Sequence, residues 1–291
     1  MKPRARIFQK ARESEVQAPR VESAPGRLGP RRRTVAPIFT LLPAGLLLAA
    51  ILMVALSPPL PAQSGEDILE RAEEALYPDD FYMEVEMNTH KPNRRDSMMV
   101  FESYHRDGAG TFMQVTAPPR SRGMRFLQKE EDLWMYNPRS NSRRAIRLSP
   151  RDSFQGSAFS NNDVGDPDYS DDYDVRLAGR ETLNHEELGS LETIKLELTA
   201  KRETTTYGRI VMWIRESDDI PLRMEYYAKS GLLFKRMTLS ALAALAGRPR
   251  PSFMRMESLE QDDFYSTVKI NEMEVRDDLP DRYFSQANLT R

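Results

Sequence analysis

Apolar and polar positions along the chain follow first a helical period and then a strand-like one. Between Ser64 and Tyr77 the apolar residues recur at the spacing of one helix face, and Pro78 follows directly. Serine is a residue type that caps helix starts, and proline ends a helix because it lacks a backbone N–H. The pattern therefore predicts one long helix over residues 64–77.

From Phe81 onward apolar side chains alternate with polar ones, which is the period of a half-buried strand. Further short segments of this kind are predicted as strands over residues 99–101, 111–115, 124–127, 133–136, 145–148, 193–198, 209–214, 222–227, 233–239, 253–259 and 266–275. Long helices do not alternate with these segments, so a parallel α/β sheet is disfavoured. We predict a mainly β (α+β) domain, an antiparallel meander or open barrel of about eleven strands.

Several predicted strands are apolar on one face and charged on the other. Ile194 and Leu196, for example, alternate with Lys195 and Glu197. One sheet face therefore meets water, and the other covers apolar material. Because a single helix covers such a face poorly, either the sheet closes on itself or its inner face leaves an apolar cavity. The alternation indicates nine residues as the lining of that cavity: Met83, Val85, Met87, Met99, Phe101, Met113, Phe126, Trp134 and Tyr136.

The first 62 residues have the order of an export signal. Residues 1–33 are basic, an uncharged apolar run follows, and proline and small residues precede Ala62. We predict a disordered basic leader over 1–33 and a signal peptide over 34–62 that is cleaved after Ala62. Leu60 fits a cleavage motif poorly, and residues 34–56 are long enough to span a bilayer. An uncleaved inner-membrane anchor, which keeps the basic leader in the cytoplasm, is therefore the alternative.

Charge is distributed unevenly between the leader and the rest of the chain. The chain holds 42 Lys and Arg and 44 Asp and Glu. Ten of the basic and three of the acidic residues lie in residues 1–33, which leaves 32 basic and 41 acidic residues from Gln63 onward. An acidic domain disfavours nucleic-acid binding, which needs a basic face. The chain has no cysteine, so it has neither disulfides nor the thiol that a lipoprotein acylates.

Residues with metal-binding character do not combine into a metal site in the sequence. His90, His105 and His185 lie in polar segments near predicted turns, without a second ligand at metal spacing, and we expect them at the surface. The aspartates of residues 163–174 lack the order of an EF-hand calcium loop. We therefore expect this segment to be a solvated loop and the protein to bind no metal or cofactor.

A catalytic site is not evident either. Ser153, Ser157 and Ser160 lie close together, but no G-x-S-x-G elbow surrounds them and no base is obvious. A lipid hydrolase that uses these serines is the weakest of our hypotheses. We expect a protein without enzymatic activity.

Residues 133–160 contain the most specific motif of the chain. An aromatic strand, 133–136, is followed by a basic segment, 143–147, and then by a serine- and phenylalanine-rich loop, 152–160. This succession resembles the outer-membrane lipoprotein-sorting proteins of the LolA-like superfamily, over roughly residues 67–285. The positions that carry the loop motif are Asp152, Ser153, Phe154, Gly156, Ser157, Phe159 and Ser160, with Gln155 and Ala158 at the variable places.

The resemblance implies an open, strongly curved antiparallel sheet, a half-barrel with a small helical lid over an apolar cavity. In the family this cavity shields acyl chains in the periplasm. Related domains are associated with inner-membrane transport machinery of the efflux superfamily. The resemblance therefore leaves two roles open, lipoprotein sorting and lipid handling beside a transporter.

Residues 63–291 are accordingly predicted to form one LolA-like domain that binds lipid or lipoprotein. We predict a monomeric periplasmic carrier or chaperone that holds acyl chains in an apolar cavity and passes them across the envelope. If the N-terminal segment is not cleaved, its residues 34–56 are the part that contacts the membrane. The alternative is a membrane-anchored interaction module with a fully packed sheet, accessory to an efflux-superfamily transporter. An internal void distinguishes the carrier from the module.

Overall fold

A computed structural model describes residues 63–130, 132–140, 142, 144–164 and 169–291, all within the compact unit Leu60–Arg291. The leader predicted over 1–33 and the signal peptide or anchor predicted over 34–62 lie outside the described residues. Among the described residues, no helix has both the length and the apolar composition that crossing a membrane requires.

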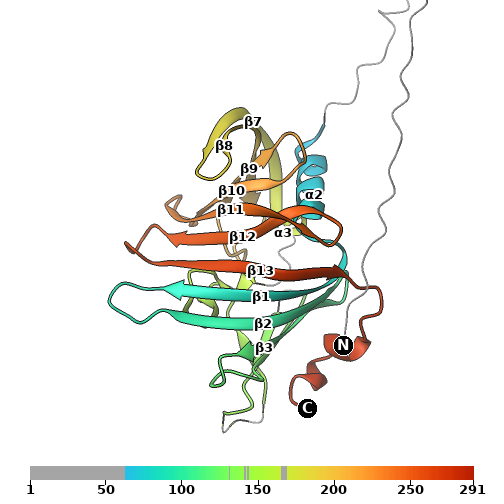
Figure 1. Cartoon of the computed structure of the whole chain (residues 1–291). Coiled ribbons are helices and arrows are strands. Elements are labelled where there is room, and N and C mark those ends of the chain that lie inside the picture. The colour runs from blue at the N-terminus through green and yellow to red at the C-terminus, as the bar shows by residue number, and fades with distance from the viewer. Residues whose placement is uncertain (1–62, 131, 141, 143, 165–168) are drawn as a thin grey trace, which may run out of the picture. The chain divides into compact units, whose positions relative to one another are not determined.

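Thirteen strands of the described residues form one antiparallel sheet (Figure 1). They are β1 (Asp80–His90), β2 (Ser97–Arg106), β3 (Gly110–Ala117), β4 (Arg125–Lys129), β5 (Asp132–Tyr136), β6 (Ile146–Leu148), β7 (Tyr173–His185), β8 (Gly189–Ala200), β9 (Arg209–Arg215), β10 (Pro221–Tyr227), β11 (Leu233–Leu245), β12 (Arg248–Ser258) and β13 (Tyr265–Val275). The predicted class, a mainly β fold with an open, curved antiparallel sheet, is confirmed, although the strand count exceeds the expected eleven.

The order of the strands places the first and the last of them side by side. β1 pairs with β13 from Phe81 opposite Val275 to His90 opposite Tyr265. From this central pair the chain runs outward as a meander to β6 on one side and to β7 on the other. The edges of the sheet are therefore the two strands that lie next to each other in the sequence, before and after the loop of residues 149–172.

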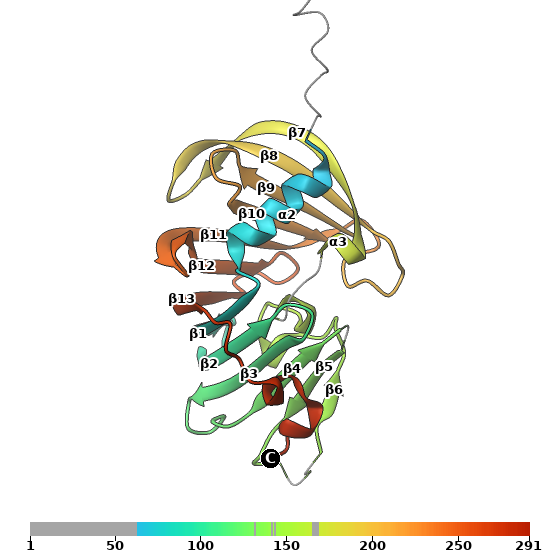
Figure 2. The same ribbon diagram turned by 90° about the vertical axis from the view of Figure 1, so that its right-hand side faces the viewer.

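One main helix, α2 (Gly65–Leu76), lies across the concave face of the second half of the sheet (Figure 2). Ser64 caps it, because the Ser64 hydroxyl accepts the amide N–H of Asp67 at 3.0 Å and Asp67 accepts the Ser64 N–H at 3.1 Å. The helix ends before Pro78, as predicted. Its apolar side is buried against the sheet through Ile68, Leu69, Ala72, Ala75 and Leu76.

Two segments of the second half differ from the prediction. β7 was not predicted, because most of its side chains are exposed on both faces and its sequence shows no alternation. β11, predicted over residues 233–239, continues as a strand to Leu245. This extension pairs with β12 from Leu242 opposite Pro251 to Leu245 opposite Arg248, so backbone pairing decides its conformation.

A separate apolar cluster covers part of the convex face of the first half. Two 3₁₀ turns near the C-terminus, η3 (Asp281–Phe284) and η4 (Gln286–Asn288), pack there against Phe112 and Leu127. Leu289 is fully buried in this cluster, and the guanidinium of Arg125 donates to the Leu289 carbonyl at 3.0 Å. The C-terminal segment therefore shields apolar side chains that the sheet itself leaves outside.

An apolar cavity between the sheet, the helix and a loop

The concave face of the sheet is not completely filled. A cavity of about 360 Å³ lies between α2, the inner faces of both halves of the sheet and the loop that follows β6. This volume falls in the range of small-molecule sites, roughly 300–1,000 Å³. The apolar side chains that line it are Leu76, Phe81, Met83, Val85, Met87, Phe101, Phe159, Val164, Met224, Met237, Leu239, Met254, Val268 and Ile270.

The nine predicted lining residues fall into three groups by their location in the structure. Four of them line the cavity: Met83, Val85, Met87 and Phe101. Another three lie on the same concave face, in the main apolar cluster, but outside the cavity wall: Met99, Met113 and Phe126. Phe154 of the following loop packs on Phe126 with ring centroids 5.0 Å apart, so the loop covers this part of the face.

Trp134 and Tyr136 lie on the opposite, convex face, and the facing predicted for them was wrong. Trp134 is paired with Leu127, whereas its neighbour Met135 is paired with Phe126. Both aromatic rings belong to the cluster under the C-terminal segment. The alternation along β5 was read in the wrong phase, because both of its faces are apolar and only the covering segment distinguishes them.

Sequence reasoning missed the cavity wall that the second half of the chain supplies. Met224, Met237 and Met254 come from three neighbouring strands, and Ile270 comes from β13. The alternation of apolar and charged residues in these strands was a signal that could have indicated them. The alternation does not show, however, that β1 pairs with β13. This pairing brings the two halves of the chain into one concave surface.

The loop with the DSF-x-GS-x-FS motif folds into the concave side as a compact unit. It consists of two turns, η1 (Phe154–Gly156) and η2 (Asn161–Asp163), closed by a bridge between Ser153 and Ser160. The Phe154 amide donates to the Phe159 carbonyl at 2.9 Å, and both rings are buried. Gly156 has φ +79°, a left-handed conformation that favours glycine. The motif therefore encodes a plug whose two phenylalanines face the core.

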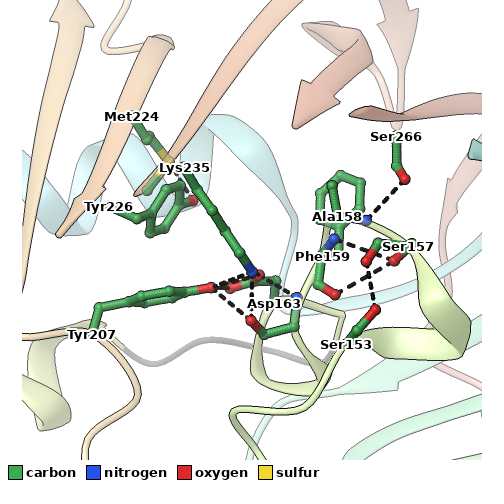
Figure 3. A network of polar contacts seen from close by, with 11 residues as sticks. Ser153, Ser157, Ala158, Phe159, Asp163, Tyr207, Met224, Tyr226, Lys235 and Ser266 are labelled. Carbon is green, nitrogen blue, oxygen red and sulfur yellow. Dashed lines mark hydrogen bonds and ion pairs between the residues drawn. The ribbon is translucent and has the colours of Figure 1, made fainter. Parts of the chain in front are cut away.

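A buried polar network joins this loop to the second half of the sheet (Figure 3). The ammonium group of Lys235 donates to the hydroxyl of Ser160 at 2.6 Å and lies 3.8 Å from the carboxylate of Asp163. The hydroxyl of Tyr207 donates to the same carboxylate at 2.7 Å. On the other side of the loop, the Ala158 amide donates to the hydroxyl of Ser266 at 3.0 Å.

Burial shapes the protonation of this network. Desolvation lowers the pKa of Lys235, and the neighbouring carboxylate of Asp163 opposes that shift. Burial also raises the pKa of Tyr207 well above its ordinary value, and the charge of Asp163 adds to this effect. Tyr207 is therefore a neutral donor at every physiological pH, and it can compensate the buried carboxylate together with Lys235.

Comparison with known proteins identifies the family. The sequence model of a family described only as uncharacterized protein matches residues 107–291, and the chain belongs to that family. A LolA superfamily protein from Nitrosomonas europaea superposes with a TM-score of 0.68 at 27% identity, over 77% of this chain and 98% of that one. This chain is a LolA-like protein. The resemblance that its motif suggested is thereby confirmed.

Two further solved structures resemble the LolA-like chain over nearly their whole length. A DUF1329 family protein from Desulfovibrio piger has a TM-score of 0.67 at 25% identity, over 77% of this chain and 97% of that one. An outer membrane lipoprotein-sorting protein domain from Vibrio parahaemolyticus shares the fold with a TM-score of 0.66 at 21% identity, over 78% and 98%. No curated protein matches the chain.

The prediction that all three histidines lie at the surface is wrong for two of them. His105 and His185 are both buried. His105 stacks on Phe81, and its Nδ1 lies 2.8 Å from the hydroxyl of Thr111. The amide N–H groups of residues 187 and 188 point at Nδ1 of His185, so its Nε2 is the protonated nitrogen and donates to the Leu239 carbonyl at 2.9 Å. Both rings therefore serve as packed, hydrogen-bonded parts of the core.

The prediction that the aspartates of residues 163–174 are solvated is wrong for Asp163. Its side chain is only 8% exposed and belongs to the network around Lys235. Asp166 and Asp168, from the same acidic segment, lie outside the described residues. The three serines lie within the folded loop; Ser153, for example, donates to the Ser157 carbonyl at 2.5 Å. Within the part of the chain that the structure describes, no group of His, Asp and Glu side chains is arranged to hold a metal ion.

Proposed function

We propose that the LolA-like chain is a carrier that holds the acyl chain of a lipid or lipoprotein reversibly in its cavity, without making or breaking bonds. The observation that supports this is the apolar cavity itself, about 360 Å³ between α2, the sheet and the plug loop. Its walls include five methionines, two from the first half of the sheet and three from the second half. The flexible thioether of methionine adapts to varied apolar ligands.

The relatives support the same function. One of the similar structures is a LolA superfamily protein, and another is a lipoprotein-sorting domain by its description. Burial of an alkyl chain contributes about 0.8 kcal/mol per CH₂, so an apolar cavity gives useful affinity without any polar contact. The alternative, an interaction module with a fully packed sheet, predicts no internal void, and the cavity therefore favours the carrier.

The location and partners that we propose follow from this function. A carrier of acyl chains has a role where lipid must cross water, and the export signal predicted over residues 34–62 would deliver the chain to the periplasm. The proposed donor and acceptor are membrane-bound, and an inner-membrane transporter of the efflux superfamily is one candidate donor. We propose that the carrier acts as a monomer.

The proposal is tested by filling the cavity. Met83→Trp places a larger side chain into the space from β1, and we expect the affinity for a neutral fluorescent alkyl probe to fall by about tenfold, equivalent to about 1.4 kcal/mol. Met98→Trp is the matched control, because Met98 lies on β2 but is exposed and outside the cavity wall. Fluorescence titration measures both variants, and their melting temperatures verify that they are folded.

A second measurement addresses the natural ligand. Native mass spectrometry of the full chain, purified from bacterial envelopes without added lipid, should show a bound species that is extracted by organic solvent and contains an acyl chain. A chain that is consistently free of ligand, and whose probe affinity is the same in Met83→Trp and Met98→Trp, contradicts the carrier function.

A further inference from the structure

The polar residues around the cavity are strongly biased in charge. Of the described residues that line it, six are carboxylates: Glu70, Glu73, Glu74, Asp79, Asp107 and Asp163. Among these same lining residues there is neither a lysine nor an arginine, and the one basic residue type is the buried His105. A cavity for fatty acids or anionic phospholipids would be expected to offer cations to the head group.

Four of these carboxylates stand at the opening. Glu70 and Glu74 are one helical turn apart on α2 and are exposed. Asp79 precedes β1 and Asp107 follows β2, and both are exposed. The Asp107 amide donates to the Asp79 carbonyl at 3.1 Å, which keeps these two residues together. The opening therefore has an acidic pair from the helix and an acidic pair from the strand ends.

The basic residues close to these carboxylates are already paired with other acidic residues or with Asp163. Arg71 pairs with Asp219 at 3.0 Å, on the side of α2 that faces the β9–β10 turn. Arg106, next to Asp107, pairs with Asp281 at 2.6 Å in the C-terminal segment. Lys235 compensates Asp163 within the buried network. For the side chains of the four carboxylates at the opening, the described residues supply no ion pair.

The guanidinium of Arg250, on β12, contacts the C-terminal end of α2. It donates to the backbone carbonyl of Glu74 at 2.6 Å, at the C-terminal end of the helix, where cations are favoured by the helix dipole. Arg250 is therefore used to satisfy the end of the helix, and its contact is with the backbone of Glu74. The negative potential at the opening is left for a ligand.

We infer that the cavity selects amphiphiles whose polar end carries a positive charge. This inference rests on the proposed function, because the tail has to occupy the apolar cavity while the head group lies among Glu70, Glu74, Asp79 and Asp107. Four carboxylates at one opening repel an anionic head group and attract a cationic one. The shared chemistry is an alkyl chain that ends in an ammonium or similar cation.

Three probes with the same tail test the inference on the full chain: dodecyltrimethylammonium, dodecanol and dodecanoate. Each is titrated below its micelle concentration against a bound neutral fluorescent probe, at pH 7 and low salt. We expect the cation to displace the probe at a concentration roughly tenfold lower than the anion, because exposed ion pairs contribute modestly and four of them act together. About 0.5 M salt should reduce this ratio severalfold, since exposed charges are screened.

A fourfold variant assigns the preference to the opening. Glu70→Gln, Glu74→Gln, Asp79→Asn and Asp107→Asn together should reduce the ratio to under about twofold and leave dodecanol binding unchanged. The control removes four charges elsewhere on the surface, with the substitutions Glu186→Gln, Glu203→Gln, Asp262→Asn and Asp277→Asn, all at exposed positions that do not line the cavity. It should retain the preference of the unmodified chain.

Each outcome separates the inference from the proposed function. Equal displacement by cation and anion, or an equal loss in the control variant, overturns the charge selection while dodecanol binding preserves the carrier. If no probe binds, both the inference and the proposed function fail.

Two more ligands distinguish the source of the charge: a single-chain lipid with an ammonium head group, and a palmitoylated peptide with two lysines. Tighter binding of either than of its anionic counterpart supports the inference, and the absence of this difference in both overturns it.

Discussion

The burial of some single residues in this protein cannot be predicted from their neighbours in the sequence. Lys235 lies in a strand between Phe234 and Arg236, where alternation suggests a solvated charge. The structure instead buries its ammonium group against the plug loop, beside Ser160 and Asp163. A buried charge requires a partner, so the stability of the loop and the protonation of Lys235 depend on each other.

Removing one member of this pair should therefore cost more than removing both. Lys235→Met leaves the carboxylate of Asp163 buried with only neutral donors, the Tyr207 hydroxyl and the Ser160 amide. We expect the free energy of unfolding to fall by about 3 kcal/mol. Adding Asp163→Asn should restore at least about 1 kcal/mol of that loss, because the uncompensated charge is gone. Urea unfolding of the single and double variants measures the coupling.

The control for this cycle is Lys269→Met, an exposed lysine on the outer side of β13. Its effect should remain within about 0.5 kcal/mol, the usual size for surface substitutions. If the effects of Lys235→Met and Asp163→Asn are simply additive, the two side chains do not act as a pair.

At the scale of elements, contacts between hairpins determine conformation where local pattern is weak. β7 forms at the edge of the sheet by pairing with β8 along its whole length, although its side chains are mostly exposed. The side chain of His90 connects the turn between β1 and β2 to the turn between β12 and β13. Its two ring nitrogens lie 2.8 Å from Asp96 and 3.1 Å from Asp263, which requires protons on both nitrogens for full pairing.

This contact predicts a pH dependence of the two hairpins. The hydrogen bonds to Asp263 and then to Asp96 raise the pKa of His90 above its ordinary 6.5. The folded state therefore binds this proton more tightly, so the stabilisation is complete below pH 6.5 and is lost as the pH rises through the raised pKa. NMR titration should give a pKa above 6.5 for His90, moving down toward 6.5 in Asp263→Asn.

His185 provides an internal comparison in the same spectra, since it is buried and held by backbone groups. Its ring resonances should be the same in Asp263→Asn as in the unmodified chain. A His90 pKa that is the same with and without Asp263 would show that the two hairpins are not linked through this ring.

For the whole molecule, the C-terminal segment decides which apolar surfaces are inside. It covers Phe112, Leu127 and Trp134 on the convex face, which makes both faces of the first half of the sheet apolar and buried. The cavity, in contrast, lies on the concave face between the two halves. The protein therefore buries a structural cluster on one side of the sheet and keeps a void on the other.

Leu289 should consequently be important for stability and unimportant for ligand binding. It is fully buried, and Leu289→Ala should reduce the free energy of unfolding by roughly 3 kcal/mol through lost burial and a new void. The affinity for a neutral alkyl probe should not change in the folded variant. Leu259→Ala, at a position 42% exposed, is the control and should change stability little. A large loss of probe affinity in Leu289→Ala contradicts this separation of the two faces.

Much of the fold was determined by local pattern in the sequence. The cap at Ser64, the stop at Pro78 and the period of two from Phe81 onward predicted the helix and most strands, because capping, backbone chemistry and one-sided burial act over a few residues. The motif of residues 152–160 likewise identified the family. Met83, Val85, Met87 and Phe101 were indicated correctly as concave-facing because their strands have one wet face.

Other features were decided only by tertiary structure. Trp134 points outward because a segment more than 140 residues later covers it, and no period along β5 encodes that contact. Lys235 and Asp163 are buried because a loop and a strand meet in space. The cavity exists because β1 pairs with β13, which closes two separate meanders into one concave surface. Such long-range pairing is set by the sum of all contacts, and a local pattern cannot contain it.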